Sequence, residues 1–191
     1  MIPAPSFATQ IPGLCESRWV GPMIHVCSLA LLHDTVAATG ARHVVSLLGS
    51  EENLVRPRGI APGNHLWLQL HDISEPRDGH VHPASGHVEA LIGFVERWER
   101  ADPLVIHCFA GVSRSTAAAF VGVCTLNPGR SETSIAKALR RASPTATPNM
   151  RIIALADRVL GRKGRMVDAI TSIGQGVLAE AAPFQLDLHG H

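Results

Sequence analysis

The sequence predicts an α/β domain in which a mostly parallel sheet of about four to five strands is flanked by helices, followed by a helical carboxy-terminal region. Short apolar runs bounded by Gly, Pro or Asp are typical of buried strands, and helical patterns lie between them. Such alternation favours a parallel sheet covered on both faces. The 191-residue chain is 46% apolar and 17% charged, so it can bury one large core. We therefore expect residues 1–191 to form a single domain.

The elements follow in order along the chain. Strands are expected at 23–30, 43–50, 65–70 and 103–109, because runs such as HVVSLLGS and PLVIHCF are short and apolar. Helical patterns cover about 29–39, 84–100, 114–126 and 132–142, and two more helices are expected after Asn149. The Pro-rich stretch SPTATPN separates the last two groups of helices. From about residue 131 onward, the chain is expected to be all helix.

Charge and cysteine content limit the possible partners. The formal net charge of +1 gives no global field for nucleic acid or an anionic membrane, so neither is an expected partner. The apolar runs are too short to span a bilayer and the first residues lack a basic leader, so we expect a cytoplasmic protein. The cysteines have no metal-binding spacing and are expected to be free thiols: Cys15, Cys27, Cys108 and Cys124.

The stretch HCFAGVSRST (residues 107–116) lies between an expected strand and an expected helix, at the sheet edge where ligands of α/β proteins bind. A loop that enters a helix amino terminus presents free backbone amides and a positive dipole end to an anion. Gly111 allows the loop to curl, and the planar guanidinium of Arg114 matches two oxygens of a phosphate. The same positive surroundings favour the thiolate of Cys108. The alternative is that Cys108 is only a small buried residue at a strand end.

These residues resemble the signature of the cysteine-dependent protein phosphatases, in which His-Cys is followed by five residues, Arg, and Ser or Thr. His107, Cys108, Gly111, Arg114 and Ser115 match it. The loop AGVSRS is most similar to that of the small dual-specificity phosphatases and of compact bacterial tyrosine-phosphatase-like proteins. The resemblance covers at least residues 65–149 and implies the protein tyrosine phosphatase-like fold.

The resemblance implies a phosphomonoester hydrolase that works in two steps and needs no metal or other cofactor. Cys108 would attack phosphorus to form a phosphocysteine, which water would then hydrolyse. Ser115 would bond the sulfur and help it to leave in the second step, unless it only caps the helix. The residues expected to hold the phosphoryl group are Phe109, Ala110, Gly111, Val112, Ser113 and Arg114.

The family also uses an aspartic acid from an upstream loop as general acid. Asp72 directly follows the strand at 65–70, where the acid of the family follows its own strand, so we prefer it to Asp78 in the turn PRDG. The gap from Asp72 to Cys108 is several residues longer than in most small dual-specificity members. The Trp-Pro-Asp form of the larger tyrosine phosphatases is absent.

The expected substrate is a phosphorylated protein, on tyrosine or on serine and threonine, or a small phosphomonoester. Phe109 and Val112 stand where phosphoinositide-directed relatives carry lysines, and the chain has no tyrosine for a phosphotyrosine-recognition loop. His80, His82 and His87 form a histidine-rich loop, but without carboxylate or cysteine partners they favour solvated side chains over a metal site.

Two other functions remain open at this point. The loop could belong to a phosphate-binding module without turnover, or to a rhodanese-like sulfurtransferase, whose active loop also begins with cysteine after a strand. The set of Cys108, Arg114 and Ser115 favours the phosphatase over both.

Overall fold

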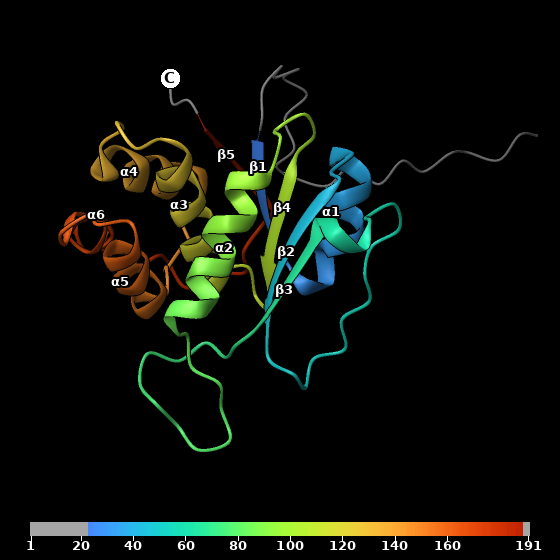
Figure 1. Cartoon of the computed structure of the whole chain (residues 1–191), viewed down its shortest axis with the longest axis horizontal. Helices are drawn as coiled ribbons and strands as arrows, with labels where there is room; N and C mark the ends of the chain where they lie inside the picture. Colours follow the sequence, from blue (N-terminus) through green and yellow to red (C-terminus); the bar gives the residue numbers. More distant parts are fainter. Residues whose placement is uncertain (1–22, 189–191) are drawn as a thin grey trace, which may run out of the picture.

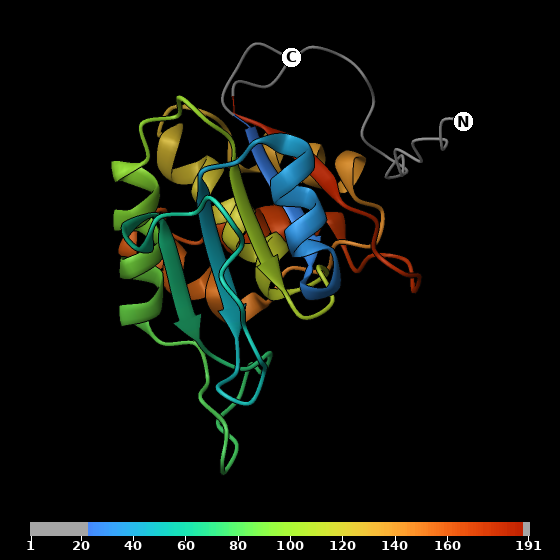
Figure 2. The same ribbon diagram turned by 90° about the vertical axis from the view of Figure 1, so that its right-hand side faces the viewer.

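The computed structural model describes residues 23–188 and shows one five-stranded sheet in the order β3-β2-β4-β1-β5. The first four strands are parallel, and the last pairs antiparallel with β1. The predicted mostly parallel α/β architecture is confirmed (Figures 1 and 2). The strands are β1 (Met23–Ser28), β2 (His43–Leu48), β3 (His65–Gln69), β4 (Leu104–Cys108) and β5 (Phe184–Asp187).

Helices cover both faces of the sheet. α1 packs on one face, while α2 and α3 pack on the other, with α4, α5 and α6 outside α3 (Figure 1). Two short 3₁₀ turns, η1 (Leu29–Leu31) and η2 (Pro62–Asn64), precede α1 and β3. The α-helices are α1 (Leu32–Thr39), α2 (Ser85–Arg97), α3 (Arg114–Leu126), α4 (Glu132–Ala142), α5 (Met150–Val159) and α6 (Arg165–Ile173).

The hydrophobic core has two parts, one on each face of the sheet. The larger cluster of buried apolar side chains lies between the sheet and α2 to α6, and a smaller one lies under α1. α3 is buried from Arg114 to Cys124 because its residues are mostly small and apolar, which lets it run close to the strands. A helix that is apolar all round belongs in the interior.

The expectation that the chain is all helix after residue 131 is wrong at its end. α6 stops at Ile173, and residues 174–183 form a connection without regular structure that leads into β5. Phe184 and Leu186 alternate with less buried residues, which is the period of a strand. The segment is short, and its two apolar positions carry too little periodicity to predict a strand from sequence.

The parallel strands bring their carboxyl ends to one edge of the sheet, seen at the bottom of Figures 1 and 2. β4 runs there into the loop that contains the phosphatase-like signature, and β3 runs into the long connection at residues 70–84. The fold thus places two segments of the predicted site side by side.

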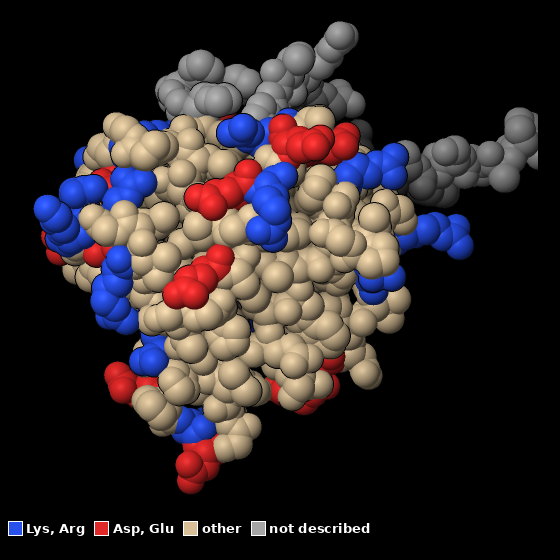
Figure 3. Space-filling model, in the orientation of Figure 1, with Lys and Arg blue, Asp and Glu red and all other residues tan. Residues whose placement is uncertain are grey.

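The surface carries both signs of charge. Lys and Arg lie over α4 to α6 at the left of Figure 3, and acidic and basic side chains are interspersed elsewhere on that face. Within residues 23–188, no helix is both long and apolar enough to cross a membrane.

Candidate active site

The loop at residues 109–113 joins β4 to α3 and presses against β1. Gly111 adopts a left-handed conformation, with φ of 77°. A Cβ atom on Gly111 would lie 2.9 Å from the carbonyl carbon of Cys27 and 3.0 Å from the backbone nitrogen of Ser28. Both the backbone angle and the close approach to β1 therefore require glycine. The tight curl turns the Gly111 amide back toward the strand end.

The sulfur of Cys108 lies at the floor of this loop, and the residue is 2% exposed. The amide of Gly111 donates a hydrogen bond to Sγ at 3.3 Å, and Oγ of Ser115 lies 3.1 Å from Sγ. When the sulfur is ionised it can only accept, so Ser115 must then be the donor. Two donors aimed at one sulfur stabilise its negative charge and make it a better leaving group.

Arg114 stands at the first position of α3 with its side chain buried. One terminal nitrogen donates to the carbonyl oxygen of Leu70 at 3.0 Å, which fixes the guanidinium against the end of β3. Its Nε is buried and, within the described residues, has no hydrogen-bond partner. A buried cationic donor without a partner is costly unless an anion binds to it. This atom is the feature of the site that most directly points to a bound anion.

Asp72 lies beside the loop. Its Oδ1 accepts hydrogen bonds of 2.8 Å from Oγ of Ser113 and from Nδ2 of Asn149. Its Oδ2 lies 3.9 Å from Nε of Arg114, and about a third of the side chain is exposed. The exposed Asp78, in contrast, lies in the turn at 76–80 and accepts through its backbone oxygen from Nδ1 of His80. The structure thus brings Asp72 to the loop and leaves Asp78 away from it.

Asn149 has a second role that the sequence did not indicate. Its Oδ1 accepts from the amides of Arg151 and Ile152 and so caps α5, as expected for an asparagine at this position. Its Nδ2 reaches Asp72, and its backbone amide donates to the carbonyl of Ser113 at 3.3 Å. Asn149 therefore holds the aspartate and the loop at once. Only the capping pattern is visible in the sequence.

The connection that carries Asp72 is closed at its base by His71. The backbone amide of His71 donates to the carbonyl of Val81 at 2.7 Å, and the amide of Val81 donates to Nδ1 of His71 at 2.8 Å. Because Nδ1 accepts, the ring proton is on Nε2, which lies 3.0 Å from both carboxylate oxygens of Glu51. These contacts fix the direction of the chain between the end of β3 and Asp72.

The histidine-rich segment serves this connection. His80 packs edge-on against His71, with ring centroids 4.7 Å apart. Nδ1 of His87 accepts from the amide of Ala84 at the start of α2. In residues 23–188, no group of three or more His, Cys, Asp or Glu side chains is arranged to hold a metal ion.

A row of polar side chains crosses the sheet behind Cys108. Oγ of Ser46 lies 2.6 Å from Nε2 of His107 and 2.8 Å from Nε2 of His65. Burial lowers the pKa of His107 to about 4, so its ring is neutral at neutral pH. The positive surroundings of Cys108 therefore come from Arg114 and the loop amides, not from the neighbouring imidazole.

The other described cysteines lie in the core. Burial raises the pKa of Cys27 and of Cys124 to about 12, so both are neutral thiols. Cys27 belongs to the apolar cluster under α1, whereas Cys108 belongs to the cluster on the opposite face of the sheet. All three are free thiols. Cys15 lies outside the described residues.

No family model matches the sequence, and no curated protein matches it. Solved structures do match. DUSP15 is 18% identical with a TM-score of 0.58, over 78% of this chain and 89% of that chain. PTP-2 phosphatase from Cydia pomonella is 19% identical with a TM-score of 0.56, over 71% of this chain and 84% of that chain. PTPMT1 in complex with PI(5)P is 13% identical with a TM-score of 0.56, over 78% of this chain and 93% of that chain. The chain therefore has the fold of the dual-specificity and tyrosine phosphatases, the superfamily whose signature its sequence resembles.

Proposed function

We propose that this protein is a phosphomonoester hydrolase that works through a phosphocysteine intermediate. The observation that carries the proposal is the arrangement at one strand end of two groups: a buried thiol with two hydrogen-bonding partners, and a buried arginine whose Nε has no hydrogen-bond partner among the described residues. A nucleophile, an anion site and a carboxyl group meet there, as phosphoryl transfer requires. The phosphatase fold supports this interpretation.

In the first step, the thiolate of Cys108 attacks phosphorus. The sulfur–phosphorus bond forms as the bond to the ester oxygen breaks, and the electron pair leaves with that oxygen. Asp72, in its protonated form, donates a proton to the departing oxygen through Oδ2, because Oδ1 is occupied by Ser113 and Asn149. Arg114 and the amides from Phe109 to Arg114 bind the non-bridging oxygens and stabilise the charge that develops on them.

In the second step, water attacks the phosphorus of the phosphocysteine. Asp72, now a carboxylate, takes a proton from this water, and the sulfur leaves as a thiolate. The hydroxyl of Ser115 and the amide of Gly111 stabilise the thiolate as it forms. The products are inorganic phosphate and the regenerated Cys108. The positive groups come from the protein, so the mechanism requires no metal ion.

The proposed substrate is a phosphorylated protein, on tyrosine or on serine and threonine, or a small phosphomonoester. Within residues 108–115, Arg114 is the only cation, and the exposed positions are Phe109 and Ala110. A multiply phosphorylated head group needs further cations around its extra phosphates. The structure of PTPMT1 holds PI(5)P, but the loop of this chain does not supply such cations.

The first test is hydrolysis of para-nitrophenyl phosphate, in the presence of chelator, by the wild type and by Cys108→Ser. The serine hydroxyl is a far weaker nucleophile than a thiolate, so we expect activity to fall by at least about a thousandfold. Cys124→Ala is the matched control, because it removes a buried thiol away from the loop. Vanadate should compete with the substrate.

Three outcomes would contradict the proposal. Full activity of Cys108→Ser would exclude the phosphocysteine. Absence of turnover in the wild type, with phosphate still protecting Cys108 from alkylation, would identify a phosphate-binding module. Release of thiocyanate from thiosulfate and cyanide, without phosphatase activity, would identify a sulfurtransferase.

A further inference from the structure

A groove lies directly beside the candidate active site, between the loop at 109–113 and the connection at 174–183. It encloses a cavity of about 430 Å³. Phe109, Ala110 and Val112 of the loop line it, together with residues 179–181 of the connection. The turn from β1 into η1 also contributes to the lining. A ligand whose phosphate sits over Cys108 would therefore have this groove as its immediate neighbour.

Hydrogen bonds hold the loop and the first part of the connection. The amide of Leu29 donates to the carbonyl of Phe109 at 3.1 Å, which joins the loop to the turn after β1. On the other side, the amide of Val177 donates to the carbonyl of Pro144 at 3.0 Å, and the guanidinium of Arg140 donates to the carbonyl of Gly174 at 2.8 Å. The loop side of the groove is thus tied to the end of β1, and the connection is tied to the helices just before the residues that line the groove.

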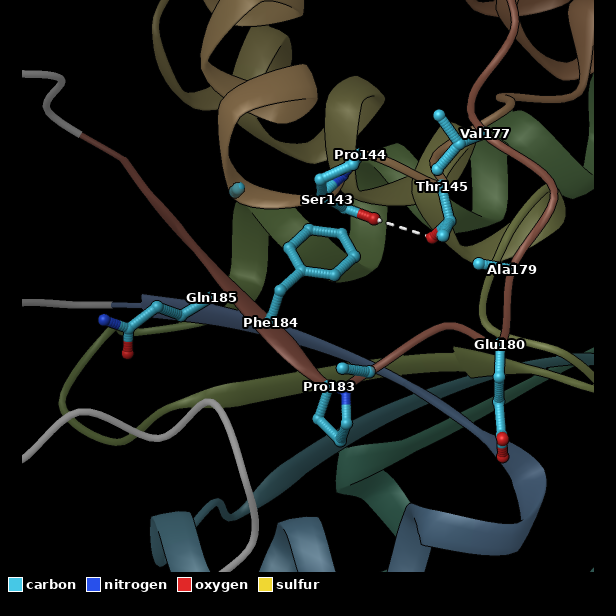
Figure 4. Close-up of a pocket in the computed structure, with 11 residues that line it drawn as sticks. Ser143, Pro144, Thr145, Val177, Ala179, Glu180, Pro183, Phe184 and Gln185 are labelled. Atoms are coloured by element: carbon cyan, nitrogen blue, oxygen red, sulfur yellow. Dashed lines mark hydrogen bonds between the residues drawn. The ribbon is translucent and has the colours of Figure 1, made fainter.

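The chemistry of the groove is apolar with a single charge. Phe109 is 61% exposed, and Ala179 and Ala181 line the same cavity. Of the described residues that line the cavity, Glu180 alone carries a charge. A second cavity of about 490 Å³, on the other side of the connection, also includes Glu180. Figure 4 shows that the Glu180 side chain extends away from Phe184 and the rest of that second cavity, toward the turn before α1.

We propose that this groove is a subsite for an arginine or lysine side chain of a phosphorylated peptide, close in sequence to the phosphorylated residue. These side chains combine a long apolar stem with a cationic end, and so match an apolar groove with one carboxylate. The methylenes pack on Phe109 and Leu29, and the cation pairs with Glu180. The inference rests on the proposed function, and it adds the class of peptide that the site prefers.

An acidic peptide fits less well. A carboxylate placed in the groove would meet Glu180 without a compensating cation, so like-charge repulsion disfavours it. The same argument applies to an anionic membrane surface, although Val177 and Leu178 expose apolar side chains next to the groove. The sign of the single charge therefore selects a basic peptide.

The test compares phosphotyrosine peptides that differ at one position. Arginine, alanine, norleucine or glutamate is placed in turn at each of the three positions on either side of the phosphotyrosine. At one position or more, we expect arginine to raise kcat/KM about fivefold over alanine, the size of effect typical of a partly exposed ion pair. Norleucine should retain only the part of the increase in kcat/KM that comes from packing of the apolar stem. Added salt should reduce the advantage of arginine over norleucine.

Variants of Glu180 identify the partner. In Glu180→Gln, the advantage of arginine over norleucine should disappear, and in Glu180→Arg the preference should move to glutamate. Glu96→Gln is the matched control, because it removes an exposed carboxylate on α2, outside the lining of the groove. All of these variants should hydrolyse para-nitrophenyl phosphate at the wild-type rate, since this substrate is too short to occupy the groove.

The outcomes separate the two proposals. Hydrolysis of para-nitrophenyl phosphate without any arginine preference would overturn the subsite and leave the proposed function intact. Should the wild type hydrolyse nothing, binding of the same peptides to Cys108→Ser still decides whether Glu180 recognises arginine. A higher kcat/KM for PI(5)P in neutral vesicles than for every peptide would overturn the choice of a basic peptide.

Discussion

Asp72 is held by two distant parts of the chain and by its own neighbour in the sequence. Ser113 belongs to the loop after β4, Asn149 precedes α5, and His71 closes the connection that follows β3. With Oδ1 occupied by two donors, Oδ2 is the oxygen that faces Arg114. The proton proposed for the leaving group must therefore reside on Oδ2.

Replacing Asp72 with Asn should impair the proposed reaction according to the leaving group. A poor leaving group such as phenol depends on the proton, so kcat for phenyl phosphate should fall by about a hundredfold or more. The fall should be much smaller for para-nitrophenyl phosphate, whose leaving group is stable as an anion. Asp78→Asn is the control and should match the wild type on both substrates. If Asp78→Asn showed the selective loss instead, the assignment of the acid would be wrong.

The part of the site that the sequence predicts best consists of residues close together in the chain. Cys108, Arg114 and Ser115 share one loop and the first turn of one helix, so their spacing alone puts them together. The position of Asp72 after a strand suggests that it lies near the loop. Its actual contacts, however, are with Ser113 and Asn149, which are 41 and 77 positions away in the sequence. The contact of Asn149 with Asp72 depends on the same long-range folding, and no local pattern indicates it.

At the scale of elements, β1 to β4 and α1 to α6 lie where apolar runs and helical periodicity predict them. The exception is the end of the chain, where β5 is stabilised by pairing with β1 and by packing of Phe184 and Leu186 in the core. Tertiary contacts of this kind decide the state of a short segment more than its own composition does.

The helices outside α3 are joined by buried charges. Arg162 donates to Glu132 at the start of α4 at 3.0 Å, and to the carbonyls of Cys124 in α3 and of Pro128 just after α3. Burial raises the pKa of Glu132. Its own backbone amide and the two arginines, Arg165 and Arg162, together lower the pKa by more than burial raises it, so the pKa lies below the usual value. Glu132 therefore contributes stability above about pH 4.5, which is lost as pH falls below that value.

Replacing Arg162 with Met should lower the free energy of unfolding by about 3 kcal/mol. Two carbonyls lose this donor, and the buried carboxylate of Glu132 loses one of its two arginine partners. Arg158→Met, which changes an exposed arginine of α5, should alter it by less than about 0.5 kcal/mol. Urea unfolding at neutral pH measures both. Equal effects of the two substitutions would show that the buried pair adds nothing to stability.

At the scale of the molecule, two buried histidines connect stability to pH. Burial lowers the pKa of His25 and of His107 from 6.5 to about 4. The unfolded chain therefore binds more protons than the folded chain between pH 6.5 and 4, so stability falls as pH decreases through this window. Each histidine contributes up to about 3 kcal/mol to the loss.

Urea unfolding at a series of pH values between about 7 and about 4.5 should show this decline. The variant His25→Gln removes one of the two groups, so its free energy of unfolding should fall less steeply with decreasing pH, whatever its stability at neutral pH. His33→Gln, which changes an exposed histidine of α1, should keep the wild-type slope. Parallel slopes for all three proteins would show that His25 is not buried in its neutral form.

The contact of Gly111 with β1 limits the local motion of the loop at 109–113. The loop cannot move toward β1, since the backbone of Cys27 and Ser28 already blocks it, and Leu29 joins the two through the carbonyl of Phe109. β1 lies between β4 and β5 in the sheet. The Leu29 amide, which bonds the loop, should therefore exchange its hydrogen with solvent as slowly as the central strands do, by global unfolding and not by local fluctuation. Exchange of the Leu29 amide as slow as that of the strand amides would show that the loop at 109–113 opens only when the central sheet unfolds.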